Sequence, residues 1–529
     1  MTPSSTSSLE SIRTAGGAPK GNTVSETGAP SGREQIHQAA RGSALNLSGA
    51  IVAAAVSFVT VGLITNNFGK AGAGLFFTAT ALFTLAANGA RLGGESSLTY
   101  FVSRLRADAR PGAIPAVVRV ALRATAVVSA LFAALGFVFA PEMAKAFATG
   151  PDNVASLTSM VRILALSAPA FSLSQAMIGA SRGFGTMRPA VLTGQFVRPL
   201  AQLGFVAAVV ALAGQPVLLA VAWALAAALA LMPITIWMRR RLARITVPAA
   251  SAASVGTTGY WRFAAPRAIT DLLSSALERA DLLLVAYFLD ETQAGVYGTS
   301  NRLIVAGQLM MFATAQSIAP HLSANFVKGR HEQAKQVLHT VSAWNVTLLW
   351  PTFIGLAFGA GTVLRLFGED FTEGALVVQI LSISLLVITG LGVGDTLLLM
   401  TGRSTASLVN HAIGLATLIV VSAVLLPRVG VIGAAWAWAA SRISIRLLAV
   451  AQVWRFNGVH GLGFPVVVAA AISVVAYVPA GWLAHGAIDS GVMAIAVHVI
   501  VGVTIQLSLC WRFRELLELD QLTTIVRRR

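Results

Sequence analysis

Five charged side chains occur within residues 264–289, an apolar run long enough to cross a membrane. They are Arg267, Asp271, Glu278, Arg279 and Asp281. At 100° per residue, all of them except Arg279 fall within an arc of about 80° on a helix, with Ser274 on the same side. A charge at the centre of a transmembrane helix costs about 2.5–3.5 kcal/mol, so such residues normally face a water-filled cavity or a partner. We therefore expect this polar stripe to line the interior of a transporter.

The acidic members of the stripe, Asp271, Glu278 and Asp281, are candidates for ion coupling. Burial favours the neutral form of a carboxylate, whereas a neighbouring arginine favours the charged form. A carboxylate that changes its protonation between two transport states would couple transport to a proton gradient, and the same group could bind Na⁺ instead. The alternative is a static ion pair that only stabilises the protein.

The composition indicates a polytopic membrane protein. Of the 529 residues, 56% are hydrophobic and 11% are charged, and the mean hydropathy is +0.74. A soluble domain carries about 25% charged residues. The formal net charge is +17, but the cations are spread over many short loops, which is typical of the positive-inside rule and not of a nucleic-acid-binding domain. We expect no nucleic-acid partner.

Fourteen apolar runs of spanning length predict an all-α integral membrane fold. The runs are 44–64, 72–95, 115–140, 157–180, 189–213, 216–238, 264–289, 296–320, 338–360, 374–398, 405–426, 430–453, 464–485 and 491–511. Residues 1–42 are rich in Ser, Thr, Gly and Pro and have no apolar period, so we expect a disordered tail there.

The loop charges orient the chain. One set of loops contains most of the cations, including the arginines of 239–244 and of the C-terminal segment. The opposite loops contain only Lys70, Lys145, Arg365 and Arg428. Cytoplasmic loops carry the excess of Lys and Arg, so both termini are expected to be cytoplasmic.

Three short segments recur at nearly one spacing. Residues 161–167 resemble 378–384 at an offset of 217 (378 − 161), 73–78 resemble 294–299 at 221 (294 − 73), and 222–224 resemble 435–437 at 213 (435 − 222). A repeat of six spans inserts both halves with the same orientation, so we expect an axis along the membrane normal to relate them.

The repeat predicts a domain plan of two six-helix lobes. We expect a disordered cytoplasmic tail, an N-lobe of spans 1–6, a basic interlobe linker, a C-lobe of spans 7–12, two extra C-terminal helices as spans 13–14, and a basic tail. In that order their bounds are 1–42, 43–238, 239–261, 262–455, 456–511 and 512–529.

Two groups of short motifs resemble a known family. The first is Arg279-Ala-Asp281, Ala294-Gly-Val-Tyr297 and Asn301-Arg-Leu303, and the second is Thr401-Gly-Arg403, Leu425-Leu-Pro-Arg-Val-Gly430 and Gly433-Ala-Ala-Trp436. With the span pattern, they resemble the polysaccharide (Wzx-type) flippases of the multidrug/oligosaccharidyl-lipid/polysaccharide exporter superfamily. The resemblance implies a transporter of the bacterial inner membrane that turns a polyprenyl-diphosphate-linked oligosaccharide to the outer leaflet by alternating access.

A diphosphate cargo directs attention to arginines at membrane depth, because the planar guanidinium makes paired, charge-assisted hydrogen bonds to phosphate. The candidates for substrate binding are Arg91, Arg198, Arg267, Arg279 and Arg302. The alternative is structural pairing, of Arg267 with Asp271 and of Arg91 with Glu95, each four residues on. Arg182 and Arg188 lie at a predicted cytoplasmic helix end and suit membrane anchoring.

Other functions of this superfamily, and one enzyme class, stay open. A lipid II flippase or a multidrug/cation antiporter would keep the fold and change the cargo, and a membrane glycan polymerase or glycosyltransferase would be an enzyme. The sequence has no GxxxxGK[ST] motif and only short outer loops. We therefore expect a protein that is not an enzyme and needs no cofactor beyond H⁺ or Na⁺. Its expected partners are the lipid-linked oligosaccharide, membrane lipids and polysaccharide polymerase machinery.

Overall fold

The protein is built from helices. This computed structural model describes residues 32–108, 110–245, 257–305, 331–392, 394, 397–398, 403–458 and 463–517, and none of them lies in a β-strand. The chain divides into two compact units, Met1–Ala44 and Leu45–Arg529. The side chains of the candidate site all belong to the second unit.

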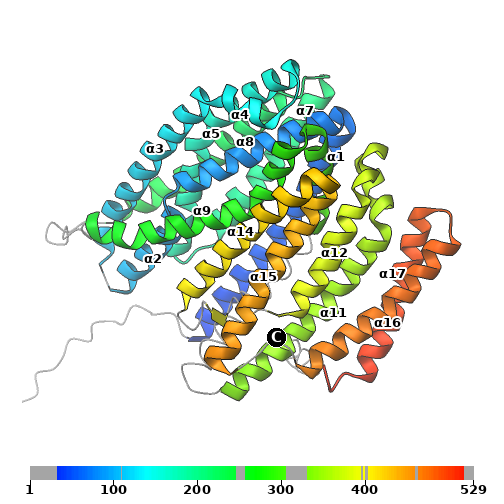
Figure 1. Cartoon of the computed structure of the whole chain (residues 1–529). Helices are drawn as coiled ribbons and strands as arrows, with labels where there is room; N and C mark the ends of the chain where they lie inside the picture. Colours follow the sequence, from blue (N-terminus) through cyan, green and yellow to red (C-terminus); the bar gives the residue numbers. More distant parts are fainter. Residues whose placement is uncertain are drawn as a thin grey trace, which may run out of the picture. The chain divides into compact units, whose positions relative to one another are not determined.

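The helices follow one another with short connections (Figure 1). The first set is α1 (Gly32–Ala90), α2 (Gly94–Ala107), α3 (Ile114–Val138), α4 (Ala140–Phe147), α5 (Pro151–Gly183), α6 (Arg188–Val191), the π-helix η2 (Leu192–Val197), α7 (Arg198–Ala211), α8 (Leu218–Ala243) and α9 (Thr257–Phe288). Residues 291–305 are also helical. The second set is α11 (His331–Leu364), the 3₁₀ turns η4 (Arg365–Phe367) and η5 (Glu369–Gly374), α12 (Ala375–Gly390), α14 (Ser404–Val429), α15 (Val431–Asn457), α16 (Phe464–Ala487) and α17 (Gly491–Arg512).

The predicted fold class is confirmed. The described residues of all fourteen apolar runs are mainly helical, although 296–320 is described only to residue 305, and residues 393, 395 and 396 of the run 374–398 lie outside the described residues. Among the described residues, ten helical segments are long and apolar enough to cross a membrane, and the first of them, Ser48–Ala107, overlaps two predicted runs, 44–64 and 72–95. The expected disordered tail, residues 1–42, is wrong in part, because its last residues are helical. Residues 1–31 lie outside the described residues, but α1 begins at Gly32, in a stretch with several good helix formers.

The predicted lobe boundaries are not decided by these helices and stay a prediction. Residues 246–256 of the expected linker and 518–529 of the expected C-terminal tail lie outside the described residues.

A turn interrupts the second apolar run, which was expected to continue to residue 95. Helix α1 ends at Ala90, and α2 begins only at Gly94. Leu92 and Gly93 between them have positive φ angles of 50° and 67°, a conformation that glycine adopts at no steric cost. A Cβ at Gly93 would lie 2.8 Å from the carbonyl oxygen of Ala264. The turn therefore packs directly against α9, the helix with the polar stripe.

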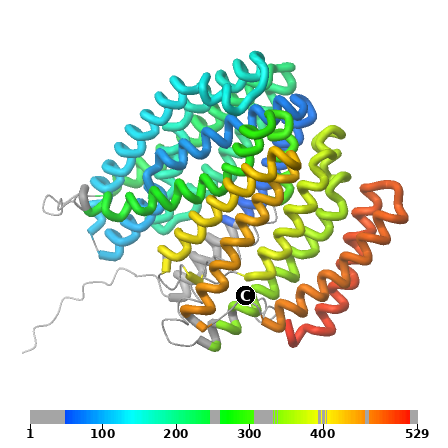
Figure 2. The backbone as a smooth tube through the Cα atoms, in the orientation of Figure 1, coloured from blue at the N-terminus to red at the C-terminus, as the bar shows by residue number. Residues whose placement is uncertain are grey.

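Helix α9 contacts helices that precede it in the chain and helices that follow it. It packs on α14 and α15, and also on α2 and α4. Figures 1 and 2 show α9 beside α14, with α14 in turn beside α15. Because lipid tails are as apolar as leucine, helices in a membrane associate through close van der Waals packing, often at small residues. Glycines at helix crossings therefore indicate which helices approach each other most closely.

Two glycines related by the sequence repeat pack against each other. Gly74 in α1 and Gly295 in the helix 291–305 are separated by the repeat offset of 221 (295 − 74). A Cβ on Gly74 would overlap the carbonyl oxygen of Glu291, and a Cβ on Gly295 would overlap the carbonyl oxygen of Lys70. Lys70 and Glu291 are themselves separated by the same offset of 221 (291 − 70). This contact is reciprocal, as expected where a two-fold axis passes between equivalent helices.

Candidate functional site

One face of α9 lines two polar cavities. The larger has a volume of about 910 Å³, and α9 contributes Phe263, Arg267, Asp271, Ser274, Ser275 and Glu278 to it. The smaller has a volume of about 280 Å³, and α9 contributes Glu278, Arg279, Asp281 and Leu282. Glu278 lines both. The charged residues of the stripe therefore follow one polar path along the helix.

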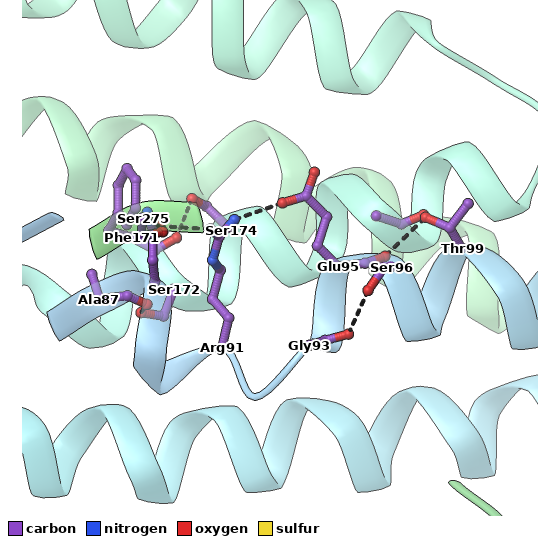
Figure 3. Close-up of polar contacts among 12 residues, drawn as sticks. Ala87, Arg91, Gly93, Glu95, Ser96, Thr99, Phe171, Ser172, Ser174 and Ser275 are labelled. Atoms are coloured by element: carbon purple, nitrogen blue, oxygen red, sulfur yellow. Dashed lines mark hydrogen bonds and ion pairs between the residues drawn. The ribbon is translucent and has the colours of Figure 1, made fainter. Parts of the chain in front are cut away.

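The larger cavity contains a cluster of one carboxylate and two arginines beside the turn at Gly93. Arg91 Nη1 lies 2.6 Å from Glu95 Oε2, and Arg182 Nη1 lies 2.7 Å from Glu95 Oε1. Figure 3 shows Arg91 and Glu95 facing each other across the turn. The expected structural pair of Arg91 with Glu95 is thus formed. Arg182, which the sequence suggested as an anchor, shares the same carboxylate.

The turn is also tied to α9 by hydrogen bonds. Arg91 Nη2 donates to Asn88 Oδ1 at 2.6 Å, and Asn88 Nδ2 donates to Ser275 Oγ at 2.8 Å. Among the described residues, the buried Nε of Arg91 has no hydrogen-bond partner. Arg91 is therefore held in place while one of its donors stays unused.

Arg267 and Asp271 line the larger cavity but do not form the ion pair considered from their spacing. Of the ion pairs between described residues, none joins these two side chains. The guanidinium of Arg267 lies instead over the ring of Phe263, 5.5 Å from its centroid, within the range of a cation–π interaction. Arg267 therefore packs on an aromatic ring and forms no direct ion pair with the carboxylate one turn away.

Asp281 is the most enclosed carboxylate of the stripe, with 2% of its surface exposed. Its oxygens accept hydrogen bonds from the Leu282 backbone N–H at 2.8 Å, the Tyr297 hydroxyl at 3.0 Å and Asn301 Nδ2 at 3.2 Å. Three donors offset much of the cost of burying a charge. Glu278, by contrast, is exposed to the space of both cavities.

Three arginines meet in the smaller cavity: Arg279, Arg302 and Arg442. Sequence reasoning missed Arg442, although it lies within the apolar run 430–453 and the rule applied to residues 264–289 would have found it. Its Nη2 donates to the Leu277 carbonyl oxygen at 3.2 Å, and its guanidinium lies 5.7 Å from the centroid of Trp438. With Glu278 and Asp281 charged, three cations and two anions line this cavity.

Arg198 is the one candidate that lines neither cavity. It begins α7, and its guanidinium lies over the ring of Phe171, 5.3 Å from the centroid. The structure thus brings Arg279 and Arg302 together in one cavity and Arg91 and Arg267 together in the other. Among the described residues, no group of three or more His, Cys, Asp or Glu side chains is arranged to hold a metal ion.

The sequence matches a family described as "Polysaccharide biosynthesis protein" over residues 39–326, which is more than half of the 529 residues. The chain belongs to this family. The resemblance inferred from the short motifs is thereby confirmed.

A curated relative supports the same assignment. The chain is 25% identical over 169 residues to the "Probable low-salt glycan biosynthesis flippase Agl15" of Haloferax volcanii. The matched region covers 30% of this chain and 34% of that protein, so the chain spans about a third of the relative's length in this comparison.

Solved structures identify the fold. The chain resembles a lipid II flippase MurJ in an inward closed conformation, with a TM-score of 0.67 and 12% identity, covering 91% of this chain and 99% of that one. It also resembles an inward-facing multidrug resistance MATE family transporter of the MOP superfamily, with a TM-score of 0.60 and 15% identity, covering 79% and 98%. A MOP superfamily transporter from Pyrococcus furiosus has a TM-score of 0.55 at 15% identity, covering 81% and 96%. The protein is therefore a multi-pass membrane protein with the fold of this transporter superfamily.

Proposed function

We propose that this protein is a flippase that moves a polyprenyl-diphosphate-linked oligosaccharide from the inner to the outer leaflet of the bacterial cytoplasmic membrane. The observation that carries the proposal is the smaller cavity, where Arg279, Arg302 and Arg442 outnumber Glu278 and Asp281. An excess of guanidinium groups suits an anionic diphosphate and disfavours a cationic drug.

The arginines in the cavity keep donors for a ligand. Among the described residues, Arg279 and Arg302 have no ion pair, and the buried Nε of Arg279 has no hydrogen-bond partner. An unpaired charge at membrane depth is costly. A diphosphate would supply the missing hydrogen-bond acceptors. Each of its two phosphate groups could accept hydrogen bonds from more than one of these guanidinium groups.

The order of features along α1 and α9 suits alternating access. Phe77 and Thr80 of α1 line the smaller cavity, and Asn88 and Arg91 line the larger one, toward the end of the helix where α2 begins. The tight Gly74–Gly295 crossing lies on the other side. From Phe77 to Asn88 an α-helix rises about 17 Å, so the polar path along α1 covers more than half of a hydrocarbon core of about 30 Å.

Several polar contacts lie at the same end of the protein as the Gly74–Gly295 crossing, which we call the closed end. Lys70 Nζ lies 2.7 Å from Glu373 Oε1, and Asn66 Nδ2 donates to the Leu366 carbonyl oxygen at 2.9 Å. Glu291, which is 4% exposed, accepts hydrogen bonds from the Thr149 backbone N–H at 3.0 Å and from Asn153 Nδ2 at 2.6 Å. Under the proposal, these contacts break when the cavity opens to the outer leaflet.

Glu278 is the best-placed group for H⁺ or Na⁺ coupling in this scheme. It lines both cavities and has no hydrogen bond to another described residue, whereas Asp281 is held by three donors. Asp271 lines only the larger cavity. We propose that the anionic cargo and the Glu278 carboxylate, which would bind the coupling ion, compete for electrostatic interaction with Arg279, Arg302 and Arg442. Transport by the Glu278→Gln variant should then lose its response to an imposed ion gradient.

Both termini would lie in the cytoplasm under this proposal, since the basic loops at the α2 and α8 ends would then follow the positive-inside rule. The protein would also work beside a polysaccharide polymerase, which would consume the exported unit on the outer face.

Purified protein in liposomes tests the proposal directly. A polyprenyl-diphosphate-linked oligosaccharide with a fluorescent sugar should become accessible to a membrane-impermeant quencher, and the Arg302→Ala variant should lose this activity. Arg162→Ala is the matched control, because Arg162 lies over Phe137 and lines neither cavity. Lengthening of the glycan would instead indicate a polymerase or glycosyltransferase, and preferred movement of lipid II would indicate the cell-wall precursor as cargo.

A further inference from the structure

Two adjoining hollows lie outside the polar path. The first has a volume of about 600 Å³ and is mostly apolar, and Leu192, Phe196, Pro233 and Trp237 are among the residues that line it. The second has a volume of about 420 Å³ and is lined by Phe184, Thr186, Trp237, Arg240, Arg241 and Arg244. Thr186 and Trp237 line both, so the two hollows lie next to each other. Neither shares a lining residue with the cavities along α9.

The apolar hollow arises where two irregular helical segments face each other. The π-helix Leu192–Val197 separates α6 from α7 and contributes Leu192, Thr193 and Phe196. Pro233 lies within α8 and lacks the N–H that would continue the helical hydrogen bonds. Single π-helical turns are frequently found at functional sites. The space between these segments lies within the range of about 300–1,000 Å³ that is common for small-ligand sites.

The two hollows differ in the side chains that line them. Leu192 is 54% exposed, and apolar side chains form most of the first hollow. Arg188 lines the first hollow, and Arg240, Arg241 and Arg244 line the second. No carboxylate lines either of them, and none of the four arginines forms an ion pair with a described residue.

Aromatic contacts hold the mouth of the site in place. The ring centroids of Phe184 and Trp237 are 5.9 Å apart in an edge-to-face arrangement. The guanidinium of Arg241 lies over Phe184, 5.2 Å from its centroid. Tryptophan and arginine at the boundary of an apolar groove form the usual surroundings of a lipid headgroup.

We infer that these adjoining hollows bind an anionic phospholipid, with an acyl chain in the apolar hollow between η2 and α8 and the phosphate among Arg240, Arg241 and Arg244. The positive-inside rule explains the arginines but not the apolar hollow next to them. The inference does not rest on the proposed cargo, because its test measures binding without transport.

Tryptophan quenching by brominated lipids tests the site in the full-length protein. The protein is placed in nanodiscs that contain phosphatidylglycerol or phosphatidylcholine with dibrominated acyl chains. The difference between the parent protein and the Trp237→Phe variant isolates the Trp237 signal. We expect phosphatidylglycerol to quench this signal at a mole fraction at least about fivefold lower than phosphatidylcholine, since even one arginine near an anionic headgroup changes affinity by about fivefold.

Two variants separate the headgroup site from the chain site. Changing Arg240, Arg241 and Arg244 to Gln should remove the preference for phosphatidylglycerol, while the matched triple change of Arg455, Arg512 and Arg514 to Gln, on exposed helix ends away from both hollows, should retain it. Leu192→Phe should reduce quenching by both lipids, and Leu229→Phe, on α8 outside the hollows, should not.

Three results would overturn the inference. Equal quenching of Trp237 by the two lipids would remove the headgroup site. Loss of the preference in the matched control triple variant would reduce the effect to general surface charge. Displacement of phosphatidylglycerol by a stoichiometric amount of polyprenyl phosphate would assign the groove to the carrier lipid instead.

Discussion

The crossing of Gly74 and Gly295 allows a quantitative prediction for conformational exchange. In the Gly74→Ala variant, the new Cβ would overlap the Glu291 carbonyl oxygen, which belongs to a backbone and cannot rotate away. Non-bonded carbon and oxygen atoms settle at about 3.5 Å, so the two helices must move apart by roughly 1–2 Å. We expect the closed contact at this end of the protein to weaken.

The size of the effect follows from the cost of overpacking. Inserting a methyl group into a well-packed contact typically costs about 1–3 kcal/mol. The same energy corresponds to a change of about 5- to 150-fold in the equilibrium between the closed and open forms. The reciprocal geometry predicts a similar effect for Gly295→Ala, because its Cβ would overlap the Lys70 carbonyl oxygen.

Spin labels across the crossing measure this shift. Cysteines at Asn67 and Asp370, in a Cys510→Ser background, carry labels on two exposed positions near the closed end. Gly74→Ala should add a population at longer label separation, whereas Gly62→Ala in the same helix should not, since a Cβ there meets nothing within 4 Å. An unchanged distance distribution in a folded Gly74→Ala protein would refute the argument from close approach.

Three further predictions concern charged groups. Lys70→Ala should shift the same spin-label equilibrium by less than about fivefold, because the Glu373 partner is 57% exposed and surface ion pairs contribute about 0–1 kcal/mol; a larger shift than that of Gly74→Ala would contradict this ranking. Glu95→Gln should lower the free energy of unfolding in detergent by about 1–3 kcal/mol, because two arginines lose their charged acceptor, and an unchanged denaturation midpoint would show that the cluster is not stabilising. Arg442→Ala and Arg302→Ala should both abolish delivery of the surface polysaccharide, while immunoblots still find each protein in the membrane; normal polysaccharide in both variants would make these charges structural.

Periodic features were readable in the amino-acid sequence because they are local or regularly repeated. Spanning runs depend on about 20 consecutive apolar residues, so all fourteen could be located without any contact information. The polar stripe from Arg267 to Asp281 depends on helical geometry alone, and the structure places its members along the two cavities. The repeat offset of 221 also proved meaningful, since Gly74 and Gly295 lie against each other.

Long-range packing settled which charges meet. Spacing alone allowed an Arg267–Asp271 pair, but the turn at Gly93 and the ring of Phe263 give Arg267 other neighbours. Nothing in the order of residues joins Arg442 to Arg279 or Arg182 to Glu95, because these partners lie on helices far apart in the chain. Helical periodicity determines which face of a helix is polar, whereas the polar partners opposite that face depend on how all the helices pack.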